Sequence, residues 1–192
     1  MDEVDKKLLE LKNTSELMID LAYSSVLFNN IEIAEEVKFL DQRMEEIADE
    51  IEEIILNMDH SKEGMVKALV LLRLKMAIEK IGDSAASISD VVTRGVSQHP
   101  VISMSLLESE VVIGMATLDS NSSLNNKTLG EIRLSSRCGM FVIAIKRGRK
   151  YIFGPGKHDV LQEGDTLLAR GPEDGLGVFQ KLAKGEIGFE EL

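Results

Sequence analysis

Proline and glycine are distributed so unevenly that they divide the chain in two. Residues 1–99 contain no proline and three glycines, whereas residues 100–192 contain all three prolines and the other twelve glycines. Because these residues interrupt helices and form turns, the first part can build long helices and the second needs frequent turns. We therefore expect a multi-domain chain, α then α+β, with a helical domain at 1–98, a linker at 99–107 and an α+β domain at 108–192.

Apolar residues in the first part recur at helical spacing and predict three long helices in an antiparallel bundle. Polar breaks at 29–30 and 58–61 separate them. The second helix has a seam with a four-three rhythm, formed by Ile33, Val37, Leu40, Met44, Ile47, Ile51, Ile54 and Met58. The same rhythm in the third helix predicts a seam of Leu71, Leu74, Ile78, Ile81, Ala85, Ile88 and Val92.

The third predicted helix is apolar nearly all round between Met65 and Ile78. A three-helix bundle covers one stripe of each helix, so the second apolar face needs another partner, which is either the second domain or a copy of the same chain. We favour self-association and expect a homodimer.

The net charge of −11 lies almost entirely in the first part: residues 1–100 carry 21 acidic and 11 basic groups. This field repels phosphate backbones, so we expect no nucleic-acid partner, and it favours a cation or a basic partner. The acidic start is unlike a signal peptide, and the sequence has no run of 18 apolar residues. We expect a cytoplasmic protein without membrane insertion.

Three pairs of the form Glu-x-x-x-Asp occur on the predicted helices, at Glu16/Asp20, Glu45/Asp49 and Glu79/Asp83. Carboxylates four residues apart share a helical face and can jointly hold a hard or borderline cation. The alternative is a solvated outer face, which is common in an acidic bundle.

The run Ala77–Asp90, which contains Glu-Lys-Ile-Gly-Asp-Ser-Ala-Ala-Ser-Ile, resembles the hallmark helix of PhoU-type proteins. Ile33–Asp49 is similar to the middle helix of that family. The resemblance implies a three-helix bundle that binds a divalent or iron-type metal ion on its acidic face. The matching carboxylates are Asp41, Glu45, Asp49, Glu79 and Asp83, while Ser87 stands at the position of the family's asparagine.

In the second part, short apolar runs alternate with turn residues. They predict strands at 111–118, 141–145, 151–153 and 166–169, a short helix at 127–134 and a last helix opening at 171–174. This order indicates a small α+β domain.

Four segments of this domain resemble the TrkA-C (RCK-C) family of potassium-transport regulators: Ser123–Glu131, Gly139–Gly148, Pro155 and Val160–Gly171. The resemblance implies a domain that dimerises and binds a small anionic regulator, such as a nucleotide, between two copies. A Gly-x-Gly-x-x-Gly phosphate loop is missing from the sequence, and a helical bundle stands where the family usually has a Rossmann domain. The combination looks like a companion of a cation channel or transporter in the membrane.

Two groups of residues are candidate ligand contacts. Asn125, Asn126, Lys127 and Thr128 lie at a polar loop and a predicted helix start, where we expect amide donors and a positive dipole end. Arg147 and Arg149 lie in the basic run 146–150 at a predicted hairpin, for which the alternative is a solvated tip.

The sequence thus predicts a non-enzymatic, dimeric, ligand-sensing protein associated with potassium or other cation transport. One alternative is a PhoU-like phosphate-signalling or metal-binding adaptor. Another is a metal-dependent hydrolase built on the acidic pairs, but no general base, nucleophile motif or phosphate loop accompanies them.

Overall fold

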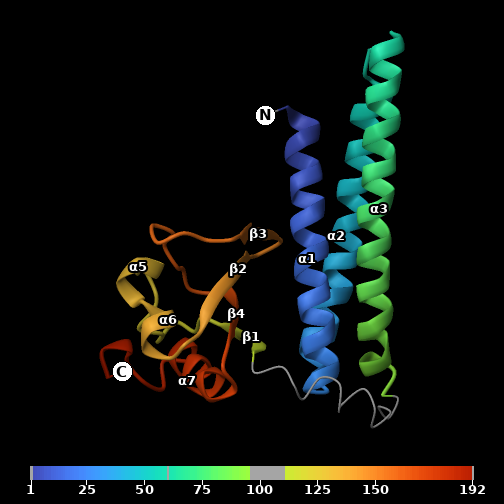
Figure 1. Ribbon diagram of the computed structural model, residues 1–192. Coiled ribbons are helices and arrows are strands. Elements are labelled where there is room, and N and C mark those ends of the chain that lie inside the picture. The colour runs from blue at the N-terminus through green and yellow to red at the C-terminus, as the bar shows by residue number, and fades with distance from the viewer. Residues whose placement is uncertain (1, 60, 96–110, 192) are drawn as a thin grey trace. The chain divides into compact units, whose positions relative to one another are not determined.

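The computed structural model describes residues 2–59, 61–95 and 111–191 (Figure 1). The chain divides into two compact units, Met1–Ser105 and Leu106–Leu192. The predicted linker at 99–107 lies outside the described residues. Among the helices described, none is both long and apolar enough to cross a membrane.

The first unit is a bundle of three helices, α1 (Glu3–Leu27), α2 (Ile31–Leu56) and α3 (Lys62–Thr93), as the sequence predicts. Side chains from the polar breaks cap the second and third helices. Asn30 Oδ1 accepts a hydrogen bond from the Ile33 amide, and Ser61 Oγ accepts one from the Gly64 amide, both at 3.1 Å. Each cap satisfies an amide that has no partner within its helix, so both helix starts are fixed locally.

The seam predicted for α2 is confirmed from Ile33 to Ile51, where all six of its members are buried. The seam predicted for α3 is wrong in part. Leu74 and Ile81 are 47% and 42% exposed, and the buried stripe runs instead through Leu71, Lys75, Ile78, Gly82, Ala85, Ser89 and Val92.

Close packing explains why the buried stripe of α3 differs from the predicted seam. A Cβ atom on Gly82 would lie 2.6 Å from Met44 Sδ of α2, so the bare glycine lets the two helices approach. Lys75 enters the same stripe because its ammonium group meets Glu52 at 2.5 Å and Glu79 at 3.0 Å. These ion pairs satisfy a charge that burial alone would penalise.

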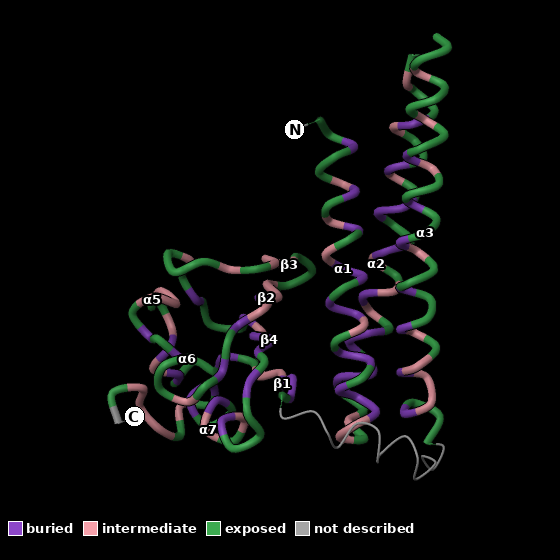
Figure 2. The backbone as a smooth tube through the Cα atoms, in the orientation of Figure 1, coloured by how far each residue is buried: buried purple, intermediate pink, exposed green. Residues whose placement is uncertain are grey.

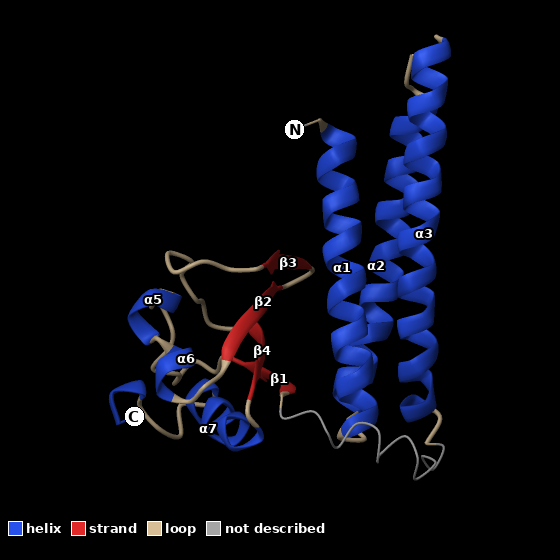
Figure 3. Cartoon of the chain, viewed as in Figure 1, coloured by secondary structure: helices blue, strands red, loops and turns tan. Residues whose placement is uncertain are grey.

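The second unit is a four-stranded antiparallel sheet in the order β1-β4-β2-β3, with short helices packed against it (Figure 3). Its strands are β1 (Val112–Thr117), β2 (Phe141–Arg147), β3 (Lys150–Phe153) and β4 (Thr166–Gly171). Its helices are α5 (Leu129–Ile132), α6 (Leu134–Arg137), α7 (Glu173–Ala183) and the 3-10 helix η1 (Phe189–Glu191). The predicted α+β class is confirmed.

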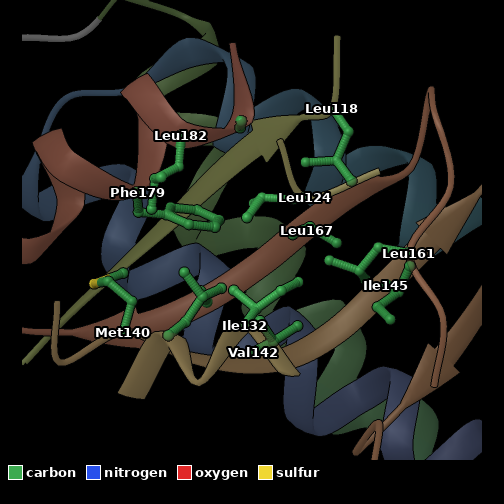
Figure 4. Close-up of a cluster of buried hydrophobic side chains, with 13 residues drawn as sticks. Leu118, Leu124, Ile132, Met140, Val142, Ile145, Leu161, Leu167, Phe179 and Leu182 are labelled. Atoms are coloured by element: carbon green, nitrogen blue, oxygen red, sulfur yellow. The ribbon is translucent and has the colours of Figure 1, made fainter. Parts of the chain in front are cut away.

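A single cluster of buried side chains holds this unit together (Figure 4). Phe179 and Leu182 of α7 meet Leu167 of β4, Val142 of β2 and Ile132 of α5, and all five are at most 5% exposed. Runs of consecutive buried residues occur in β1 and β4, whereas the edge strand β3 has no buried residue. The core therefore fixes α5 and α6 against the start of β2.

Gly175 lets α7 pack closely against the backbone that precedes β2. A Cβ atom there would lie 2.1 Å from the Cys138 carbonyl oxygen, which is backbone and cannot turn aside. We expect Gly175→Ala to lower the free energy of unfolding by about 1–3 kcal/mol in urea denaturation, as overpacking does. Gly177→Ala on the same helix meets nothing within 4 Å and is the matched control, expected to stabilise the chain slightly through helix propensity. Equal effects of the two substitutions would contradict the packing argument.

Candidate functional site

A cavity of about 250 Å³ lies between α5, α6, the start of β2 and the loop after β3. One side is apolar, with Leu129, Met140 and Val142, and the mouth carries the cations Arg133 and Lys157. The full lining is Leu129, Gly130, Arg133, Leu134, Ser135, Ser136, Met140, Phe141, Val142, Pro155, Gly156 and Lys157. We call it the α5–α6 pocket.

Arg133 reaches this pocket through an unusual backbone conformation. It ends α5 and begins α6 with φ 51° and ψ 45°, a left-handed conformation that residues other than glycine and asparagine rarely adopt. Ile132 and Leu134 on either side are buried, whereas the Arg133 side chain is exposed. The tight junction of two short helices thus presents a guanidinium group between two core anchors.

Backbone hydrogen bonds hold the loop that carries Lys157 against α5. The Gly130 amide donates to the Lys157 carbonyl at 2.9 Å, and the Leu129 amide donates to the Asp159 carbonyl at 3.1 Å. A Cβ atom on Gly130 would lie 2.8 Å from the Lys157 oxygen, so glycine is needed for this contact. Lys157 is therefore positioned by the fold of the loop.

A more open hollow of about 500 Å³ shares Gly130, Arg133 and Lys157 with the pocket and adds Thr128, Glu131, Arg137 and His158. Glu131 is the acid among these residues, and its carboxylate is held by the Thr128 amide at 2.7 Å and hydroxyl at 2.9 Å. These hydrogen bonds keep the pKa of Glu131 below its ordinary value. The region has three basic side chains, of which Arg137 also donates to the Phe189 carbonyl, and one internally bonded carboxylate, so it suits an anion.

The expectation of free amide donors at the start of α5 is wrong. The Thr128 amide bonds to Glu131, the Leu129 and Gly130 amides bond to the loop at 157–159, and the Glu131 amide bonds to Thr128 Oγ1 at 3.2 Å. Capping and loop contacts use these groups within the domain, so a ligand has to be held by side chains. Thr128 itself lines the open hollow.

The other residues predicted in that loop do not line either hollow. Asn125 Nδ2 donates to the Asp119 and Ser120 carbonyls at 2.8 and 3.2 Å, which closes the loop, and its buried Oδ1 has no hydrogen-bond partner in the described part of the chain. Asn126 adopts a φ of 61°, and Lys127 Nζ lies 6.0 Å from the centre of the Phe189 ring. Their role toward a ligand stays a prediction.

Of the two predicted hairpin arginines, Arg147 is committed to an internal contact. Its Nε and Nη2 atoms each donate to a different oxygen of Asp165 at 2.7 Å, and Nη2 also donates to the Val160 carbonyl at 2.9 Å. The Asp165 carboxylate raises the pKa of Arg147. Arg149 is exposed in the hairpin turn, two residues away.

Sequence reasoning missed Arg133, Arg137 and Lys157. A signal existed for the first of these. With Leu129, Ile132 and Leu134 placed inward on the predicted helix at 127–134, Arg133 had to point outward. The loop carrying Lys157 lies against α5 because the two segments form backbone hydrogen bonds with each other. Residue spacing in the sequence does not predict such a contact between separate segments.

The predicted metal ligands occupy the outer side of α2 and α3. The pKa of Asp41 is raised, first by burial and then by repulsion from Glu45 and Asp83. These three carboxylates therefore interact electrostatically. Glu79 is paired with Lys75, and Asp49 is exposed. Within the described ranges, no three His, Cys, Asp or Glu side chains are grouped closely enough to hold a metal ion. Metal binding stays a prediction.

Comparison with known protein families agrees with both halves of the fold. Residues 8–92 match the PhoU domain, and residues 113–184 match the TrkA-C domain. The chain joins a PhoU domain to a TrkA-C domain. Both resemblances inferred from the sequence are thereby confirmed.

The relatives of this PhoU–TrkA-C chain include transport proteins. It is 20% identical over 113 residues to the ammonium/H⁺ antiporter subunit AmhM of Alkalihalophilus pseudofirmus, covering 59% of this chain and 68% of AmhM. Among solved structures, the RCK_C domain dimer of Streptococcus agalactiae BusR in complex with c-di-AMP shows 22% identity and a TM-score of 0.35, covering 42% of this chain and 97% of that one. The RCK C domain of the potassium transport protein KtrA, also in complex with c-di-AMP, shows 26% identity and a TM-score of 0.36, covering 43% and 94%.

Proposed function

We propose that this protein is a non-enzymatic regulator that binds a small anionic ligand and acts on a cation transport system. The observation that carries the proposal is the α5–α6 pocket, where Arg133 and Lys157 stand beside an apolar wall. A nucleotide combines the two properties such a site recognises, an apolar planar base and a charged phosphate.

The size of the pocket favours one nucleotide moiety for each copy of the chain. Its volume of about 250 Å³ is below the roughly 300–1,000 Å³ of a typical ligand pocket. Two copies related by a two-fold axis would offer two such pockets to a symmetric ligand. The cyclic dinucleotide named for BusR and KtrA supports this class of ligand.

The names of the relatives also guide the choice of partner. AmhM is named as an antiporter subunit and KtrA as a potassium transport protein, so we propose a cation channel or transporter as the membrane partner. BusR is also known in complex with promoter DNA. The net charge of −11 argues against nucleic acid as a partner of this chain.

Calorimetry and thermal shift on the full chain test the ligand, with cyclic di-AMP, ATP, AMP and NADH as probes. We expect saturable binding of at least one of them, with a higher unfolding temperature in its presence. Promoter-length duplex DNA serves as the comparison and is expected not to bind. Absence of binding across the panel would contradict ligand sensing and leave the TrkA-C domain as an assembly unit.

The PhoU domain supports a second candidate function, a metal-binding or phosphate-signalling adaptor, through its acidic outer side. If metal binds, Glu79 and Asp83 are expected to be ligands, with Asp41, Glu45 or Asp49 as the second arm. We expect elemental analysis of chain purified without chelator to find bound iron, zinc or a similar ion, and to find less of it in a Glu79→Gln/Asp83→Asn variant. Equal metal content in both proteins would leave these carboxylates as a solvated face.

A further inference from the structure

Helix α3 carries an exposed stripe whose charges change sign from one end to the other. It consists of Lys62, Met65, Leu69, Leu72, Met76, Glu79 and Asp83, which we call the α3 stripe. At 3.6 residues per turn these positions fall within roughly 100° of the helix circumference. The stripe begins with a base, continues with four apolar residues and ends with two acids.

The apolar centre of the stripe is uncovered. Met65, Leu69 and Met76 are 63%, 51% and 52% exposed, and Leu72 is half-buried. No residue of α3 before Leu71 is buried, and Figure 2 shows the N-terminal end of the helix as largely exposed. An apolar strip of this length on a bundle helix is typical of a helix that packs against another helix.

The charges at the two ends of the stripe are only partly paired among the described residues. Neither Lys62 nor Asp83 forms an ion pair in the part of the chain described here, and Glu79 shares Lys75 with Glu52. A partner surface with charges of the opposite sign can therefore form ion pairs with each end.

A second α3 stripe can pair with both charged ends when it runs antiparallel to the first. In an antiparallel pair, Lys62 of each copy faces the Glu79–Asp83 end of the other, and apolar residues face apolar residues. A parallel pair places base against base and acid against acid, which is unfavourable. The midpoint between positions 62 and 83 falls between Leu72 and Arg73, so a two-fold axis there places Lys62 opposite Asp83 and Leu69 opposite Met76 of the other copy.

We propose that the α3 stripe is an isologous interface, occupied by the antiparallel α3 helix of a second copy of this chain. The proposal gives the acidic pair Glu79/Asp83 a second use and supplies a two-fold axis of the kind that the proposed function invokes for a symmetric ligand. It is independent of the α5–α6 pocket, so failure of ligand binding leaves it intact.

Disulfide crosslinking tests the orientation, using single cysteines in a Cys138→Ser background of the full chain. Leu72→Cys lies next to the axis and is expected to form a dimer disulfide under mild oxidation. Met65→Cys lies about 7.5 residues from the axis, so the two copies of it are separated by roughly 22 Å along the helix. That is far beyond the 7 Å limit for Cα atoms joined by a disulfide. Efficient crosslinking at Met65, with or without crosslinking at Leu72, would overturn the antiparallel arrangement.

Sedimentation equilibrium tests the chemistry of the interface. Leu69→Lys is expected to raise the dimer dissociation constant at least tenfold, whereas Ile31→Lys, at a residue 57% exposed on α2, is the matched control and is expected to leave it unchanged. Lys62→Glu and Asp83→Lys are each expected to weaken the dimer, and the double variant to restore part of the loss. A wild-type chain that is monomeric at tens of micromolar, or a dimer insensitive to Leu69→Lys, would overturn the proposal.

Discussion

Arg147→Ala is expected to lower the free energy of unfolding by about 2–3 kcal/mol, less than the loss of a fully buried ion pair costs, because the Arg147 side chain is 36% exposed to solvent. Asp165 is 1% exposed and accepts two hydrogen bonds from the Arg147 side chain. Without Arg147, its carboxylate keeps the Gln162 amide at 2.8 Å but lies buried without a counter-charge. Urea denaturation followed by circular dichroism measures the loss.

A double variant separates this mechanism from a simple loss of contacts. Arg147→Ala combined with Asp165→Ala removes both charges, so we expect it to be more stable than Arg147→Ala alone. Lys150→Ala, at an exposed residue of the same hairpin, is the matched control and is expected to change stability by less than about 0.5 kcal/mol. If the double variant is less stable than Arg147→Ala, the stranded carboxylate is not the cause.

The Arg147 pair also shows how far sequence reasoning reaches in the α+β unit. The basic run at 146–150 and the turn at Gly164–Asp165 are both visible in the sequence, and both predicted strands form. Their pairing depends on the register of β2 against β4, which places Lys146 opposite Thr166. Spacing along one strand does not reveal a partner on another, so the sequence does not predict the contact between Arg147 and Asp165.

The helical unit shows a different limit. Periodicity predicted α2 well because its apolar residues form one stripe, flanked by charges. In α3 the apolar residues surround the helix between Met65 and Ile78, so periodicity fits more than one seam. Gly82 and Ser89 both lie on the buried stripe of α3, and Gly82 lets this helix approach α2 closely. Neither residue has a large apolar side chain, so apolar spacing in the sequence does not select them.

Replacing Arg133 or Lys157 with alanine is expected to weaken binding of the anionic ligand by roughly 10- to 100-fold, the equivalent of losing one charge-assisted hydrogen bond. Both side chains are exposed and line the α5–α6 pocket, and neither belongs to the buried core cluster. We therefore expect the unfolding temperature without ligand to stay close to that of the wild type. Isothermal titration with the probe that binds in the panel measures the change.

Lys127→Ala combined with Asn126→Ala provides the matched comparison, because it removes polar groups from the neighbouring loop that do not line the pocket. If the α5–α6 pocket is the site, this variant binds within about threefold of the wild type, since it removes no charge that contacts the ligand. A large loss with Lys127→Ala/Asn126→Ala, and none with Arg133→Ala or Lys157→Ala, would move the site to the loop before α5. Because Asn125 closes that loop through the Asp119 and Ser120 carbonyls, leaving it unchanged keeps the loop folded in the comparison. The two variants therefore distinguish a site built from side chains of α5, α6 and the loop at 155–158 from one built on the polar loop before them.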